Sequence, residues 1–303
     1  MNGAHLHLLL NHIPTVGFAA AVILFVTGLM KKSRDLTQAS YAALFLTALL
    51  AIPAYISGNA AEFILREEAG ISTPVLAAHQ SAAALGFVFI QLTGVVAWVA
   101  LWRFQRWTTP ALLALSAATC ALMARAATMG GGIRHPEILA GDSAVPVATW
   151  PDVAAMGTAL IVNYPWVWPI CEILHFVGLT LLFGIVFLQN LRIVGFIKGV
   201  ALADLNRLLP WAMVGLVINV VTGMLFVLAS PDQYTQNAAF MWKIGMLVVA
   251  GASLLYPIMS DEISTLTHNA HASMVARCLA AGSICLWVGV IFLGRFLPYL
   301  GSE

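Results

Sequence analysis

Eight long apolar stretches dominate this sequence of 303 residues. A helix needs about 20 apolar residues to cross roughly 30 Å of hydrocarbon, and a chain in lipid must satisfy its backbone hydrogen bonds internally. With 61% hydrophobic and 9% charged residues and a mean hydropathy of +0.91, the composition lies outside that of soluble globular domains. We therefore predict an all-α, multi-pass protein of the lipid bilayer. The predicted spans are residues 13–30, 37–60, 75–101, 110–129, 168–190, 208–229, 238–259 and 274–297.

A polar-leaning stretch, residues 130–165, separates these spans into two groups of four. It begins with three consecutive glycines and is interrupted by prolines, which is typical of a domain boundary. We predict two four-helix bundles: an N-terminal membrane domain at 1–129, an outer-face loop at 130–165 and a C-terminal membrane domain at 166–303.

Lys and Arg are distributed unevenly between the two sides of this topology. Nine of the fourteen fall in the loops on one side, and an excess of Lys and Arg marks the cytoplasmic face. This predicts a bacterial inner-membrane protein with both termini in the periplasm. No Lys or Arg precedes the first span and no small-residue cleavage site follows before Lys31, so we expect the span to be retained. The net charge of +1 argues against nucleic acid as a partner.

Histidines lie at the predicted outer ends of several spans. His5, His7 and His12 precede the first apolar run, His79 lies about one turn into the third span, and His175 about two turns into the fifth. An ionisable group inside a span is costly unless it has a partner, and neutral imidazole is a common ligand of haem iron. We predict haem b near the outer face, one or two per chain, with axial ligands drawn from His12, His79, His175 and His7.

Pro14 sets the order of preference among the first histidines. A proline disfavours helix at the residue before it and suits the first turn of a helix. Regular helix is therefore predicted from Pro14 onward, with His12 at the membrane surface and with His5 and His7 further toward water. His12 is the preferred ligand, and His7 is held in reserve.

Charged residues near the same face are candidates for contacts with the haem propionates, for orienting an imidazole or for proton transfer. Haem propionates need cations or hydrogen-bond donors, and the candidates are Arg66, Arg125, Arg134, Lys243 and Arg295. The simpler interpretation for most of them is that they reach the lipid headgroups. Glu62 and Glu172 are candidates for orienting an imidazole or accepting a proton from a quinol; the alternative for both is a hydrated interfacial carboxylate.

The first half resembles a known family. It opens with His7-x-x-x-x-His12-Ile13-Pro14, has a second helix with Gly58 that ends near Glu62, and starts its third helix at Ala78-His79. Over residues 5–128 this pattern resembles a bacterial family of four-helix membrane domains that open with His-x-x-x-x-His-x-Pro and carry a further histidine at the start of the third helix. The resemblance implies that this half binds haem b.

The second half, residues 166–299, resembles another four-helix membrane family. That family is similar in layout to copper-resistance D type membrane domains and to small cytochrome b subunits. The resemblance is carried by Glu172-Ile-Leu-His175-Phe-Val-Gly178, Asn190-Leu-Arg192, Leu209-Pro210-Trp211, Thr222-Gly223, residues 234–243, and Trp287 through Arg295. Members often carry a histidine where this chain has Tyr256-Pro257, so a second haem held entirely in this half is not implied.

Together these observations predict a cytochrome b type electron-transfer subunit of a membrane oxidoreductase. It would exchange electrons between a quinol or quinone and a periplasmic redox protein or other subunits of a membrane complex. Two alternatives stay open: a protein that handles or transports copper or another metal, using His5, His7 and the outer histidines, and a scaffold subunit without a cofactor.

Overall fold

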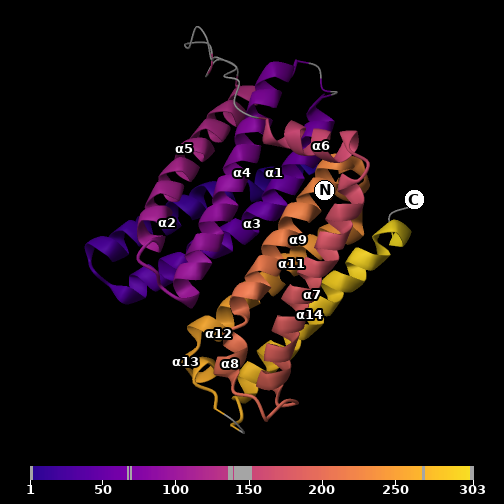
Figure 1. The fold of residues 1–303 in the computed structure, drawn as a ribbon. Coiled ribbons are helices and arrows are strands. Elements are labelled where there is room, and N and C mark those ends of the chain that lie inside the picture. The colour runs from indigo at the N-terminus through magenta and orange to yellow at the C-terminus, as the bar shows by residue number, and fades with distance from the viewer. Residues whose placement is uncertain are drawn as a thin grey trace. The chain divides into compact units, whose positions relative to one another are not determined.

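The computed structural model describes residues 3–66, 68, 70–135, 139, 152–267 and 270–300. These form two compact units, residues 1–159 (unit 1) and 160–303 (unit 2), each of which is described by itself (Figure 1). Within the described ranges the chain forms helices and no strands.

Unit 1 contains four helical spans, drawn from indigo to magenta in Figure 1. The first is built from α1 (Gly3–Leu10), the π-helical turn η1 (Ile13–Gly17) and α2 (Phe18–Met30). It is followed by α3 (Arg34–Arg66), α4 (Thr73–Trp102) and α5 (Thr108–Arg134). The most buried of the spans is α3, which packs against α1, α2 and α4.

The helix before Pro14 corrects the sequence-based prediction. Regular helix was expected only from Pro14 onward, yet the first span begins at Gly3. Proline lacks an N–H and its ring clashes with the carbonyl four residues earlier, and the wider π turn at Ile13–Gly17 accommodates it. The Thr15 hydroxyl donates to the Asn11 carbonyl at 3.1 Å. His7 therefore lies on a helix packed against α3 rather than toward water.

Unit 2 also contains four long spans. They are Val167–Val194, Leu202–Ala229, Ala238–Met259 and Met274–Leu297. Their helices are α7 (Val167–Val194), α8 (Leu202–Asn206), α9 (Leu209–Ala229), α10 (Pro231–Thr235), α11 (Ala238–Ala252), η3 (Ser253–Leu255), α12 (Tyr256–Met259), α13 (Asp261–Ser264) and α14 (Met274–Leu300). The two closest helix pairs are α7 with α9 and α11 with α14.

These spans confirm the predicted fold class, an all-α polytopic membrane protein with eight helices long and apolar enough to cross a bilayer. Part of the predicted outer-face loop is helical: residues 130–134 continue α5, and a short apolar helix, α6 (Val153–Asn163), forms near its end. Residues 136–138 and 140–151 of that loop lie outside the described residues.

A buried arginine holds together the end of unit 2 at which α7 finishes. Arg192 is 1% exposed and donates from Nε to the Val200 carbonyl (2.6 Å), from Nη1 to Ala270 (3.3 Å) and from Nη2 to Thr267 (2.6 Å). A guanidinium suits this role because its donors are fixed in a planar fork. It joins the end of α7 to two connecting segments that are remote in sequence.

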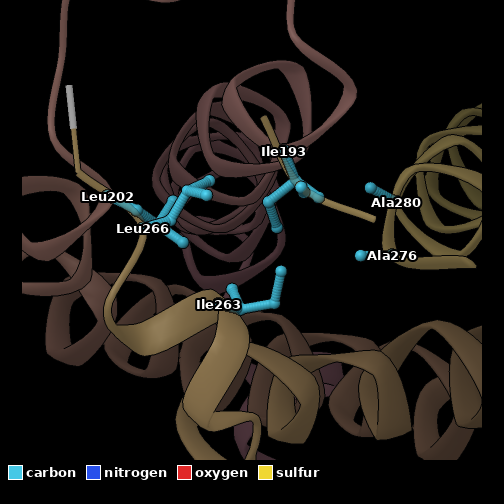
Figure 2. Packing of buried hydrophobic residues seen from close by; sticks show 7 residues of the cluster. Ile193, Leu202, Ile263, Leu266, Ala276 and Ala280 are labelled. Carbon is cyan, nitrogen blue, oxygen red and sulfur yellow. The ribbon is translucent and has the colours of Figure 1, made fainter. Parts of the chain in front are cut away.

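An apolar cluster lies beside this arginine. Figure 2 shows the side chains of Ile193, Leu202, Ile263 and Leu266 converging, with Ala276 and Ala280 of α14 nearby. The small alanines allow α14 to approach closely, as small residues do in membrane helix packing. The cluster and the Arg192 hydrogen bonds together fix the connections at this end of the unit.

We expect Arg192→Met to destabilise the protein by about 2–4 kcal/mol, because three buried carbonyls would lose a charged donor. Unfolding in mixed micelles of increasing SDS content measures this. Arg207→Met is the matched control, since the Arg207 side chain is 81% exposed, and its effect should be within about 0.5 kcal/mol. Equal stability of the two variants would contradict the role assigned to Arg192.

Candidate functional site

A cavity of about 510 Å³ lies inside unit 1. All four spans of the unit contribute to its walls, through α1 and η1, the second half of α3, the first half of α4 and the second half of α5. Its size is within the range of small-molecule and cofactor sites. Three of the predicted ligands line it: His7 and His79 from different helices, and His12 at its rim.

His7 is held on α3 by its Nδ1 atom. Nδ1 lies 3.1 Å from the Ala54 carbonyl oxygen and 3.3 Å from Ser57 Oγ, which itself donates to the same carbonyl. A carbonyl only accepts, so His7 Nδ1 carries the proton and Nε2 carries the lone pair. The imidazole lies against Gly58, where an added Cβ would come within 3.1 Å of His7 Cε1.

His79 is held in the same way on α5. Its Nδ1 lies 2.8 Å from the Ala126 carbonyl oxygen and therefore donates to it. The ring lies against Gly130, where an added Cβ would come within 3.0 Å of His79 Cε1. Both imidazoles are thus partly buried and fixed in orientation, and each has an unprotonated Nε2. No described residue donates a hydrogen bond to either Nε2.

The two arrangements are related by a shift of 72 residues. His7, Ala54 and Gly58 correspond to His79, Ala126 and Gly130, and each histidine bonds to a carbonyl 47 residues further on. Buried positions of the first span recur in α4 at the same shift: Pro14 with Gly86, Phe18 with Ile90, Ala21 with Thr93, Phe25 with Ala97, and Gly28 with Ala100. Unit 1 is therefore an internal repeat of two helical hairpins, and each hairpin presents one carbonyl-anchored imidazole to the cavity.

A polar atom in the cavity wall has no hydrogen-bond partner among the described residues. The Asn11 side-chain Oδ1 is buried without a hydrogen bond in the structure, and Asn11 lines the cavity one helical turn from His7. A buried oxygen in this condition is destabilising by about 1–3 kcal/mol. Such an orphaned group is typical of a site that receives a ligand.

The rest of the wall is mostly apolar, with a few polar side chains and with charge at one boundary. Tyr55 and Phe87 stack at 4.7 Å and both line the cavity. Glu62 also lines it and pairs with Arg66 on the next helical turn.

Among the predicted cations, Arg134 is the one that lines the cavity within the described part of the chain. It forms a two-pronged ion pair with Glu68, with both N–O distances at 2.9 Å. Arg125 lies partly buried on α5 outside the lining. Of the cations proposed for propionates, Arg134 is therefore the best placed.

The structure places His7 differently from the sequence-based prediction, which put it further toward water than His12. The His12 side chain is exposed and lies at the rim of the cavity, whereas His7 is partly buried and anchored inside it. The reason is the helix before Pro14, which continues the face of the first span back to His7. The shift of 72 residues between the two His-Ala-Gly sets would have identified His7 from the sequence.

The other predicted site residues belong to unit 2. His175 is partly buried on α7, with Nδ1 at 2.7 Å from Thr222 Oγ1. Glu172 is exposed and accepts a hydrogen bond from Trp168 Nε1 at 3.1 Å. Burial and, to a lesser degree, the negative charge of Glu172 raise the pKa of Tyr234 in α10. Arg295 is exposed on α14. The role of His175 as a haem ligand therefore remains a prediction, and it concerns unit 2 alone.

No protein-family model, no curated protein and no solved structure matches this chain. The two family resemblances remain predictions, and the assignment of the site depends on its geometry. Within the described ranges, no group of three or more His, Cys, Asp or Glu side chains converges as a metal site would.

We expect Asn11→Leu to stabilise the ligand-free protein by about 1 kcal/mol, because it removes an unsatisfied buried oxygen at similar volume. The measurement is unfolding in mixed micelles of protein prepared without added cofactor. Asn163→Leu is the control, since Asn163 is exposed, and should leave the stability unchanged. A loss of stability in Asn11→Leu would show that Oδ1 has a partner in the folded protein.

Proposed function

We propose that unit 1 binds haem b between His7 and His79 and that the chain is a cytochrome b type electron-transfer subunit of a membrane oxidoreductase. The observation that carries this proposal is the pair of symmetry-related imidazoles in one cavity, each with Nδ1 held by a backbone carbonyl and Nε2 unpaired. Metal-ligating histidines typically donate their other ring N–H to such a second group.

The cavity fits the cofactor in several independent respects. Two axial imidazoles suffice, because the macrocycle supplies the other four ligands of the iron. Tyr55 and Phe87 offer an apolar, aromatic wall, and Asn11 offers an unused acceptor. Arg134, at the end of α5, is the residue that would hold a propionate.

Haem held by His7 and His79 would supply one-electron transfer. The protein would fix both ligands, exclude water through its apolar wall and set the charge near the cofactor. The proposed role is electron exchange between a lipid quinol and a redox protein at the predicted periplasmic face. Glu62, at the cavity boundary, would accept a proton there.

The test is the reduced-minus-oxidised spectrum of protein purified from haem-replete cells, together with haem quantified per chain. The wild type should show a sharp α-band, and His7→Ala and His79→Ala should each lose most of it. His12→Ala is the matched control, because His12 is exposed at the rim, and it should keep the full spectrum.

A colourless wild-type protein would refute the proposal. If that colourless protein bound copper and lost it in His7→Ala, metal handling would replace haem binding as its function. A coloured protein whose spectrum depends on His12 rather than His7 would refute the ligand pair while leaving haem binding in place.

The glycines beneath the imidazoles provide a second prediction. Gly130→Val should lower the affinity for haem by about tenfold, because its Cβ would displace the His79 ring, and second-shell changes at metal sites have effects of this size. Gly17→Ala is the control, since an added Cβ there would make an ordinary contact at 3.8 Å with Thr47. Haem titration followed in the Soret band measures both. Equal affinities would show that Gly130 does not position the ligand.

A further inference from the structure

Unit 2 repeats the spacing of the unit 1 hairpins with three changes: a lysine replaces one histidine, a phenylalanine replaces one glycine, and a threonine hydroxyl replaces one carbonyl. In unit 1 each histidine faces a glycine 51 residues further on. In unit 2 the residue 51 beyond His175 is Phe226, whose ring lies 5.8 Å from the imidazole. The residue 51 beyond Lys243 is Gly294, where an added Cβ would lie 3.1 Å from Lys243 Nζ. Lys243 in the hairpin of α11 and α14 thus takes the place of the second histidine.

His175 presents an acceptor. Thr222 Oγ1 donates its proton to the Ile218 carbonyl at 2.7 Å, so the 2.7 Å contact with His175 Nδ1 requires that Nδ1 be the donor. His175 Nε2 therefore carries a lone pair, and no described residue donates to it. Gly223 leaves room beside the ring, with an added Cβ 3.7 Å from His175 Cε1.

Lys243 presents donors. Its side chain is partly buried in a membrane span, and it has no hydrogen bond or ion pair to any described residue. Its electrostatic interaction is with His175. A charged group within a span is costly unless it meets a partner or a ligand, and it indicates a functional site by default.

We propose that His175 and Lys243 bind the head group of a lipid quinol, whose hydroxyl donates to His175 Nε2 while its oxygen accepts from Lys243 Nζ. A phenolic hydroxyl satisfies both residues through one oxygen. A fatty-acid carboxylate would satisfy Lys243 and leave His175 without a donor, and a metal would satisfy His175 and leave Lys243 without an acceptor.

The surroundings suit a ligand that arrives from the bilayer. Trp168 and Phe226 lie 4.9 Å apart beside His175 and offer aromatic faces to a ring. Phe176 and Val177, which follow His175 on α7, are exposed apolar residues of a membrane span. The inference rests on the proposed function, which makes the quinol a partner in electron exchange, but its test concerns unit 2 alone.

Binding to the full chain in nanodiscs tests the inference, with decylubiquinol and decylubiquinone as probes, titrated calorimetrically under argon against empty nanodiscs. Lys243→Met should weaken both probes about tenfold, because both have an oxygen that accepts from Nζ. His175→Phe should weaken the quinol about tenfold and the quinone less than about threefold, because the quinone has no hydroxyl to donate. The controls His271→Phe and Lys198→Met change exposed residues of the same unit and should change neither affinity.

Thr222→Val keeps the inference testable if His175→Phe does not fold. Without the threonine acceptor, the imidazole is free to move its proton to Nε2, so quinol binding should fall while quinone binding is kept or strengthened. Equal affinities in the wild type, Lys243→Met and His175→Phe would overturn the inference, and so would an equal loss of both probes in His175→Phe. The haem spectrum should be unchanged in all these variants, so a colourless chain that still discriminates the probes would refute only the haem proposal.

Discussion

The hydrogen bond from an imidazole Nδ1 to a backbone carbonyl is the interaction on which the site in unit 1 depends. In a membrane span a histidine must find a partner for each nitrogen or leave a costly polar atom in an apolar environment. Ala54 and Ala126 each provide that partner for one nitrogen of His7 and His79. The protein thus meets half of the requirement itself, and the other nitrogen of each ring is left to whatever enters the cavity.

The same scaffold carries two different pairs of groups in the two units. Unit 1 has two imidazoles in matching positions, which suits a symmetric ligand with a metal at its centre. Unit 2 has an imidazole and an ammonium in the matching positions, which suits a ligand that both donates and accepts a proton. Similar helical hairpins thus present different side chains in the two units, and the proposed ligands differ accordingly.

The fold was predictable from the sequence because membrane crossing depends mainly on the length of apolar stretches. The eight spans required no knowledge of which helices touch. His79 was predicted as a site residue because, once the spans are known, it is a lone ionisable group inside one of them. The start of regular helix at Pro14 was predicted wrongly, because the rule that proline starts a helix applies to an α turn, and Pro14 lies in a π turn instead. The preference for His12 over His7 as a ligand stays a prediction.

Other parts of the site could not be obtained from local patterns. The carbonyls that hold the imidazoles belong to alanines, which carry no chemical signal of their own. The missing partner of Asn11 Oδ1 is a property of packing, and so is the isolation of Lys243. What the sequence does contain is the 72-residue shift, which is visible only when segments 72 residues apart are compared rather than read in turn.

The face of the first span has a consequence for how such a site can arise. His7, Asn11, Pro14, Phe18, Ala21, Phe25 and Gly28 follow one another at alternating intervals of four and three residues, which is the spacing of a coiled-coil seam. The last four are buried and apolar, as the seam of any bundle is, whereas the first two are polar and border the cavity. The cavity is therefore the end of an ordinary packing seam, at which the side chains of the first span are polar rather than apolar. A membrane bundle needs no additional domain to acquire such a site, because a few substitutions at the last turns of its seam suffice.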